Sequence, residues 1–304
     1  MRILLLVNSS ASSVTARGRV MIQKALSADH EVTMAETSRR GHATRLAQGA
    51  AVEGIDVVVV LGGDGTLNEA ANGLAGSDTA LAALPGGSTN VFARTLGLPD
   101  DAIEATVVVL DALAQNSIRR VGLGMVNGRY FLFHAGMGFD AAVIARVERR
   151  ASLKRYASHP LFLFSAFETW FRGYDHERPH FAVHFPDGDV IDDAYFGVCL
   201  NTNPYTYLGA RPVNVAPGTN LDTGLAMVSM RSLALPTIVS IGLSTLGSGQ
   251  RLRKHPAVDH RSDLSSVRIE GFGPFPYQVD GDYLGEVSAL EFQHKKDILA
   301  LVIP

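Results

Sequence analysis

The sequence predicts two domains: an α/β domain built on a parallel sheet over residues 1–125, then an all-β, sandwich-like domain over residues 126–289. Continuous apolar runs separated by helix-like segments fill the first part, which is typical of a parallel sheet covered on both faces. After about residue 125 the strand-like runs become short and alternating. The chain has 304 residues, 46% hydrophobic and 19% charged, so it is long enough and apolar enough for two cores.

The first domain is predicted from alternating strands and helices. Parallel sheets of this kind bind ligands at the carboxyl ends of their strands, so the residues that follow each strand are the candidates for a site. The predicted strands are 2–7, 30–36, 55–61 and 80–84, and the predicted helices are 16–27, 41–53 and 66–75.

The second domain begins with a candidate hairpin. "HFAVHF" alternates in polarity, "PDGD" at 186–189 is a turn signal, and we expect "AYFGVCLN" to pair back on the first strand. Further short strands are predicted at 225–230, 266–271 and 299–304. Cys199 is the single cysteine and lies in an apolar run, so an internal disulfide is excluded and a buried, inert thiol is expected.

The composition excludes several classes of protein. A formal net charge of −3 argues against nucleic-acid binding, which usually needs a basic excess. No stretch approaches the roughly 18 apolar residues of a membrane span, and the first apolar run is too short for a signal peptide. We therefore expect a cytoplasmic protein. The ten histidines show no metal-ligand spacing, and His134 is expected to be a satisfied core or cleft residue.

A loop of three glycines around one acid ends the third predicted strand, in "VVVVLGGDGTLNEAANGL" at 57–74. Glycine permits positive φ or a close approach by another group, and amides at a helix N-terminus attract anions. An ionised Asp64 could hold magnesium or orient an attacking hydroxyl, and we expect no capping or core role for it. Thr66 and Glu69 match a T-x-x-E capping box.

A second glycine loop follows the next strand, in "ALAALPGGSTNVFARTLGLP". Ser88 could be an ordinary helix N-cap there. Two glycine loops after neighbouring parallel strands are nevertheless hard to explain as coincidence, and they predict a phosphate site. Neither loop is a Walker A sequence, and no G-x-G-x-x-G fingerprint follows the first strand.

Four segments, in order, resemble the catalytic domain of the diacylglycerol kinase family, in its soluble bacterial branch: "GGDGTLNEAANGL", "LPGGSTNVFARTLGLP", "VNGRYFLFHAGMGFDA" (126–141) and "VDGDYLG" (279–285). Sphingosine kinases are close relatives of that family, whereas NAD kinases and phosphofructokinases share only the Gly-Gly-Asp-Gly loop. The resemblance implies ATP- and Mg²⁺-dependent transfer of the γ-phosphoryl group to a lipid hydroxyl, with diacylglycerol as the first choice. It also implies a nucleotide between the α/β and sandwich domains, and a last strand, about 290–304, that packs back onto the first domain.

The resemblance also implies roles for individual residues. Asp64 and Asp282 would be catalytic, and Asp64, Asp282 and Asp222 would bind metal, with Asp222 near a second magnesium site of bacterial members. The nucleotide-binding positions implied by the motifs and by the ends of the first two strands are Asn8, Thr37, Gly62, Gly63, Asp64, Gly65, Thr66, Asn68, Glu69, Gly87 and Ser88.

Two positions depart from the family pattern. The second loop has Asn90-Val91-Phe92 where the family usually has Asn-Asp-Phe, so a carboxylate of its metal network is missing. The late motif ends in Asp280-Gly281-Asp282 instead of Asp-Gly-Glu. Asp282 would be the base that accepts the proton of the lipid hydroxyl, with a side chain one methylene shorter. The same "VDGD" is also an ordinary hairpin sequence.

A lipid substrate stays in its bilayer, which implies peripheral contact with the inner face of the membrane. The segment 145–173 combines three basic residues at helical spacing with an apolar stripe, and it is either a membrane-surface element or an ordinary amphipathic helix. Its basic residues are Arg146, Arg150 and Lys154, and its stripe is Leu163, Phe167, Trp170 and Phe171.

Two other functions stay open. One is a kinase for another acceptor, such as a sphingoid base, another glycerolipid, a polyprenol-like alcohol, NAD or a sugar. The other is a catalytically silent nucleotide- or lipid-binding module, which the two departures motivate. The sequence does not decide the oligomeric state, and a homodimer remains an option.

Overall fold

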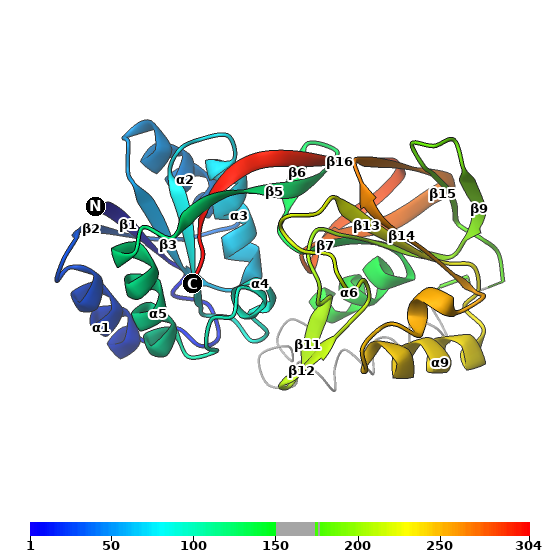
Figure 1. Cartoon of the computed structure of the whole chain (residues 1–304), viewed down its shortest axis with the longest axis horizontal. Helices are drawn as coiled ribbons and strands as arrows, with labels where there is room; N and C mark the ends of the chain where they lie inside the picture. The colour runs from blue at the N-terminus through cyan, green and yellow to red at the C-terminus, as the bar shows by residue number, and fades with distance from the viewer. Residues whose placement is uncertain (150–173, 176) are drawn as a thin grey trace. The chain divides into compact units, whose positions relative to one another are not determined.

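The computed structural model describes residues 1–149, 174–175 and 177–304 (Figure 1). The chain forms two compact units, one made of residues 1–123 and 295–304 and the other of residues 124–294. Strands β5 and β16 each contain residues of both units. In the described part of the chain, no helix is long and apolar enough to cross a membrane.

The first unit is built on four parallel strands in the order β4-β3-β1-β2. β3 is the run of four valines, and all six of its residues are buried, as expected for β-branched side chains covered on both sheet faces. β1 lies in register with both neighbours, so that Leu5 is opposite Met34 on one side and Val59 on the other. The strands are β1 Arg2–Val7, β2 Glu31–Glu36, β3 Val57–Gly62 and β4 Ala80–Pro85.

Helices connect these strands, and two of them have the N-caps that their sequences favour. Thr15 accepts a hydrogen bond from the amide of Gly18 at the start of α1, and Asp101 accepts from the amides of Ile103 and Glu104 at the start of α5. The helices are α1 Ala16–Leu26, α2 His42–Val52, α3 Asp64–Leu74, α4 Val91–Thr95 and α5 Ala102–Ala114.

The last ten residues belong to the first unit. The end of β16 (Asp282–Val302) lies parallel to β4, with Leu301 opposite Leu81. The amide of Ile303 donates to the carbonyl of Ser117 at 3.0 Å, and the Ser117 hydroxyl donates back to the Ile303 carbonyl at 2.6 Å. The C-terminus accordingly lies among the elements of this unit (Figure 1).

The second unit is mostly β, and its strands pair in the order β14-β13-β10-β7-β15-β16, with β8 added on β15 and β9 added on β8. β15 pairs with β8 through Arg268–Gly271 and with β7 through Tyr277–Val279, on either side of a register shift. The elements are β5 Ile118–Val126, β6 Arg129–Phe131, β7 His134–Gly138, α6 Phe139–Arg149, β8 Phe181–His184, β9 Val190–Ala194, β10 Phe196–Leu200, β11 Thr206–Leu208, β12 Arg211–Val213, β13 Leu225–Met230, α9 Leu235–Thr245, the 3-10 helix η1 Leu252–Lys254, β14 Val258–Leu264 and β15 Ser266–Val279.

The predicted α/β domain followed by a mostly-β region is confirmed, but the predicted hairpin is wrong in its partner. β8 pairs with β9, and β10, which contains "FGVCL", lies between β7 and β13 instead. The physical reason is burial: four of the five residues of β10 are buried, so it needs a neighbour on each side, whereas β9 is partly exposed. Cys199 on β10 is buried as expected, and its burial raises the pKa of the thiol.

The membrane segment predicted at 145–173 falls mostly outside the described residues. Arg146 lies on α6, whereas Arg150, Lys154 and the predicted apolar stripe are not described.

Candidate functional site

The two glycine loops of the first unit pack backbone against backbone. The amide of Gly86 donates to the carbonyl of Gly62 at 2.9 Å. A Cβ on Gly86 would lie 2.9 Å from the Gly62 nitrogen, and one on Gly87 would lie 2.8 Å from the Gly63 Cα. None of these four glycines has positive φ. Close approach of the two loops is therefore the reason for glycine at positions 86 and 87.

Asp64 is the first residue of α3, and its carboxylate binds the start of α4. Its two oxygens accept hydrogen bonds from the amides of Val91 at 3.0 Å and Phe92 at 3.1 Å. The expectation that Asp64 has no capping role is therefore wrong, because the helix that it caps follows the other glycine loop. Burial raises the pKa of the Asp64 carboxyl, the two amides lower it, and the negative charge of Asp100 raises it further.

Asp100 is a carboxylate at this site that the motifs did not reveal. Its Oδ1 accepts from Asn90 Nδ2 at 2.8 Å, and the same Nδ2 donates to the Gly87 carbonyl at 3.0 Å. Asn90 is in the left-handed conformation, with φ of 49°, and its Oδ1 accepts from the Gly87 amide at 2.7 Å. Asn90 thus holds the Asp100 carboxylate close enough for its negative charge to raise the pKa of Asp64.

The predicted capping box at Thr66 and Glu69 is wrong. Helix α3 begins two residues earlier, at Asp64, with Gly63 as its N-cap. Thr66 instead accepts a hydrogen bond from Asn8 Nδ2 at 2.9 Å. The Glu69 carboxylate caps a different helix, α2, by accepting from the amides of Gly41 at 2.7 Å and Ala43 at 3.1 Å.

The remaining nucleotide-binding candidates also follow the parallel strands or lie on α3. The Asn8 amide donates to the carbonyl of Leu61 at the end of β3, and the Thr37 amide donates to Val7 at the end of β1. Gly65 and Asn68 are on α3, where Asn68 is buried. Ser88 is exposed on the second loop, and it is not the cap of α4, whose N-cap is Asn90.

In the second unit, Asp280 and Gly281 form the two-residue turn between β15 and β16. Both have positive φ, and the flanking Val279 and Asp282 are paired, so the hairpin interpretation of "VDGD" is confirmed as geometry. Asp280 is buried and accepts three backbone hydrogen bonds, from residues 132–134, at 2.7–3.1 Å. Asp282 is partly exposed and forms a salt bridge with Arg129 at 3.1 Å. Its role as a base stays a prediction.

A series of buried hydrogen bonds connects this turn to Asp140 on α6. The Gly281 amide donates to Gln278 Oε1 at 2.8 Å, and Gln278 Nε2 donates to Asp140 Oδ2 at 2.8 Å. The other oxygen of Asp140 accepts from the Tyr205 hydroxyl. Burial raises the pKa of the Asp140 carboxyl and that of Tyr205. The third motif contains Asp140, but its pattern assigned it no role.

His134 lies beside this group, with its ring edge-to-face with Tyr205 at a centroid distance of 4.2 Å. It is buried as expected, but its Nδ1 has no hydrogen-bond partner among the residues that the structure describes, so the expectation that it is satisfied is wrong. Burial lowers the pKa of His134 to about 3, which keeps the ring neutral at physiological pH.

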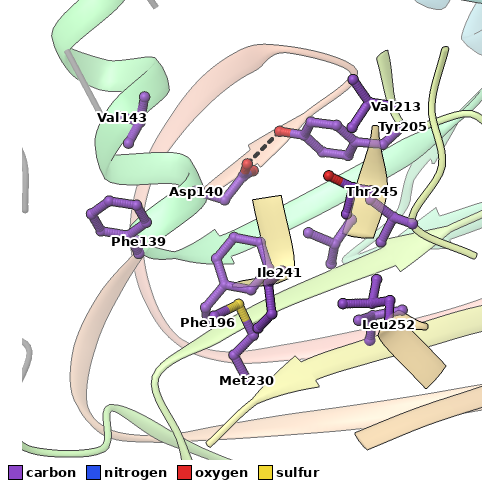
Figure 2. A pocket seen from close by; sticks show the side chains of 13 residues that line it. Phe139, Asp140, Val143, Phe196, Tyr205, Val213, Met230, Ile241, Thr245 and Leu252 are labelled. Carbon is purple, nitrogen blue, oxygen red and sulfur yellow. Dashed lines mark hydrogen bonds between the residues drawn. The ribbon is translucent and has the colours of Figure 1, made fainter. Parts of the chain in front are cut away.

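An apolar cavity of about 210 Å³ lies in the second unit, with the Asp140–Tyr205 hydrogen bond in its wall (Figure 2). Thr245 is the other polar lining residue, and its hydroxyl donates to the Gly242 carbonyl. The lining residues are Phe139, Asp140, Val143, Phe196, Val198, Tyr205, Val213, Val215, Val228, Met230, Ile241, Thr245 and Leu252.

The three predicted metal ligands are divided between the two units, and their role as ligands stays a prediction. Asp222 is exposed in a turn where its amide donates to Asn220 Oδ1 at 2.9 Å. Among the described residues, no group of three or more His, Cys, Asp or Glu side chains is placed to hold a metal ion. Asp64 belongs to the first unit, and Asp222 and Asp282 belong to the second.

Comparison with known proteins identifies the first unit. Residues 2–126 match the family described as the diacylglycerol kinase catalytic domain. This part of the chain belongs to that family. A diacylglycerol kinase from Bacillus subtilis is 40% identical over 121 residues, which are 39% of each protein. A diacylglycerol kinase from Staphylococcus aureus is 29% identical over 284 residues, which cover 90% of this chain and 83% of the relative.

The fold of the whole chain is also that of a solved structure. A putative diacylglycerol kinase from Bacillus anthracis superposes with a TM-score of 0.76 at 24% identity, covering 100% of this chain and 97% of the other. The likeness extends over both the parallel α/β unit and the mostly-β unit, and it shows that the two proteins share a fold.

Proposed function

We propose that this protein is an ATP-dependent lipid kinase that transfers the γ-phosphoryl group to a lipid hydroxyl, with diacylglycerol as substrate and phosphatidic acid as product. The observation that carries the proposal is the pair of glycine loops at the carboxyl ends of β3 and β4, which pack together while Asp64 binds the amides at the start of α4. Family membership of residues 2–126 supports kinase chemistry.

The loops would bind the triphosphate through backbone amides, which need no side chain between them and the phosphates. Mg²⁺ would supply charge neutralisation, and the donors present suit it, because Asp64 and the nearby Asp100 offer carboxylate oxygens, which hard cations prefer. Asp64 holds the cation only when ionised. The cation itself favours that state, which opposes the raised pKa of the buried carboxyl.

Asp282 would accept the proton of the lipid hydroxyl as the oxygen–phosphorus bond forms. An aspartate is a weak base at neutral pH, but in a loose transition state the proton leaves late, so orientation counts for more than basicity. The salt bridge to Arg129 and the fixed turn before Asp282 would provide that orientation.

The cavity of the second unit supports a lipid acceptor. Its lining is apolar apart from Asp140, Tyr205 and Thr245, which is the environment that a hydrocarbon chain needs. A sugar or nucleotide acceptor would leave many of its hydroxyl groups without partners in such a cavity.

The test is turnover of Asp64→Asn on diacylglycerol in mixed micelles, with the product identified by mass spectrometry. We expect a loss of at least about a hundredfold, because the uncharged amide would hold the neutralising Mg²⁺ much more weakly than the carboxylate does. Asp29→Asn is the matched control, since Asp29 is exposed and outside the site. If Asp64→Asn kept turnover within about twofold of the wild type, the proposed role of the site would be wrong.

A second candidate function is a catalytically silent binding module, which Val91 and the short Asp282 side chain favour. It predicts Mg-ATP binding by calorimetry without phosphorylation of any lipid. A panel of glycerolipids, sphingoid bases and polyprenols in the same assay separates this candidate from a kinase with another acceptor.

A further inference from the structure

Helix α9 exposes a stripe of large apolar side chains. Leu235, Val239, Leu243 and Leu246 are 48%, 52%, 70% and 42% exposed. They are spaced four, four and three residues apart, so they lie on one face of the helix. The helix contains no charged residue. A contiguous apolar face of this kind on a water-soluble surface usually marks an interaction site.

The other face of α9 lines the cavity. Ile241 and Thr245 belong to the cavity wall, and Thr245 is buried. Ile241 is labelled in Figure 2, and α9 is the gold helix in Figure 1. A single layer of helix therefore separates the apolar cavity from the exposed apolar stripe.

Uncompensated positive charge follows the helix. Arg251, Arg253 and Lys254 lie on or next to η1, which packs against α9, and all three are exposed. None of the three forms a salt bridge with any other residue that the structure describes. From Gly224 to Val258 the sequence contains no aspartate or glutamate. An apolar helix face beside free cations is the combination that binds anionic bilayers.

We propose that the α9 stripe and the basic residues 251, 253 and 254 form the surface with which this protein docks on an anionic lipid bilayer. The stripe inserts at the headgroup boundary while the cations lie among the headgroups. A symmetric contact with a second copy is less suitable, because it would bring the same three cations of each chain toward each other. The bilayer would then lie directly above the roof of the cavity. A lipid acceptor would enter the cavity from the bilayer beneath α9. Only this entry of lipid rests on the proposed function.

The test is sedimentation of the full chain with phosphatidylcholine vesicles, either pure or containing about one third phosphatidylglycerol. Arg253→Glu/Lys254→Glu should weaken partition onto anionic vesicles at least thirtyfold or so, because each cation contributes about 1 kcal/mol near such a surface. Val239→Ser/Leu243→Ser should weaken it by about tenfold. Wild-type binding should be much weaker on the uncharged vesicles.

The matched controls remove equivalent groups elsewhere. Val52→Ser/Val107→Ser replaces two exposed valines of the first unit, and Arg17→Glu/Arg45→Glu reverses two exposed arginines there. Both should bind vesicles like the wild type. Unchanged binding of the α9 and basic variants would overturn the proposal. So would a wild-type dimer, seen by sedimentation velocity, that Val239→Ser/Leu243→Ser converts to monomer without any effect on vesicle binding.

Kinase assays separate this proposal from the proposed function. On a short-chain, monomeric diacylglycerol, the α9 variants should turn over like the wild type, while on anionic vesicles they should be slower in proportion to their lost binding. If the wild type phosphorylated no lipid but still bound vesicles through α9, the kinase assignment would fail and the docking surface would stand. Normal turnover of the α9 variants on vesicles would contradict the docking surface instead.

Discussion

Asp64 and Asp140 are both carboxyls with a raised pKa, but their partners differ. Asp64 is held by backbone amides of α4, whereas Asp140 is held by the side chains of Tyr205 and Gln278. In both, loss of water on burial is the largest influence on the pKa. An ionised Asp64 would be stabilised by a cation, but Asp140 has no positively charged partner among the described residues and lies in the wall of an apolar cavity.

Asp140→Asn should change how stability depends on pH. Because the folded-state pKa of Asp140 is raised, the folded protein binds the proton more tightly than the unfolded chain does, and the wild type loses stability as the pH rises above about 4. The loss continues until the pH passes the folded pKa. The asparagine cannot ionise, so the free energy of unfolding of the variant should increase relative to that of the wild type as the pH rises through this range.

Urea denaturation of both proteins between pH 4 and 8 measures this effect. Asp29→Asn serves again as the control, because its exposed carboxyl should give the wild-type profile. Parallel profiles for Asp140→Asn and the wild type would mean that the burial of Asp140 does not control its ionisation.

At the scale of the elements, the glycine loops and the helix caps show how segments that are distant in sequence contact and stabilise each other. Asp64 of α3 caps α4, and Glu69 of α3 caps α2, across 26 to 28 residues. The two loops also touch along their backbones, at Gly62 with Gly86 and at Gly63 with Gly87. The candidate phosphate site is therefore built by three helices and two loops together.

Gly86→Ala should disrupt this arrangement. The added Cβ would lie 2.9 Å from both the nitrogen and the Cα of Gly62, and backbone atoms cannot move aside as a side chain can. We expect the free energy of unfolding to fall by about 1–3 kcal/mol and Mg-ATP binding to weaken. Thermal unfolding and calorimetric titration with Mg-ATP measure the two effects.

Gly49→Ala is the matched control for this substitution. Gly49 lies inside α2 and does not have positive φ, and a Cβ added there would meet no heavy atom within 4 Å. Alanine at this position should therefore be neutral or stabilise the helix by up to about 1 kcal/mol. If Gly86→Ala behaved like Gly49→Ala, the close approach of the loops would not be what requires glycine.

The elements also show how much of the fold could be predicted from the sequence. The strands at 2–7 and 80–84 were predicted to within one residue, because a continuous apolar run bounded by polar residues marks a buried strand by itself. The partner of a strand is not encoded locally, so the hairpin of β8 was assigned to β10 instead of β9. Helix α9 was not predicted, although Pro236 lies in its first turn, where proline is tolerated.

The candidate site was predicted in part for the same reason. The motifs located the two glycine loops and Asp64, since those residues are contiguous in sequence. They gave no sign of Asp100, which is ten residues from its partner Asn90 and matches no motif. The T-x-x-E pattern was misleading at Glu69, because a contact with α2 replaced the local one.

At the scale of the whole molecule, the chain leaves its first unit at residue 123 and returns to it at residue 295. The returning segment carries four consecutive buried residues, Leu299 to Val302. Its main-chain contacts with β4 and Ser117 make it part of the first unit's sheet and core. The stability of the first unit therefore depends on the last residues of the sequence.

Leu301→Ala should lower the free energy of unfolding by about 3 kcal/mol, because Leu301 is fully buried opposite Leu81 and its truncation leaves a cavity. Lys296→Ala, on the same strand but exposed, should change it by no more than about 0.5 kcal/mol. Guanidinium denaturation followed by circular dichroism measures both. Equal stability of the two variants would mean that the returning segment contributes little to the first unit.

The return of the chain to the first unit also determines the order in which the two units can be completed during synthesis. A growing chain can complete the second unit, residues 124–294, before the first, because the first still lacks its final strand when the second has fully emerged. The two glycine loops thus lie in the first third of the sequence to be translated, but they belong to the last unit that can be completed. A nascent chain halted before residue 295 would present an unfinished sheet edge at β4, a place where chaperones or a neighbouring chain could bind.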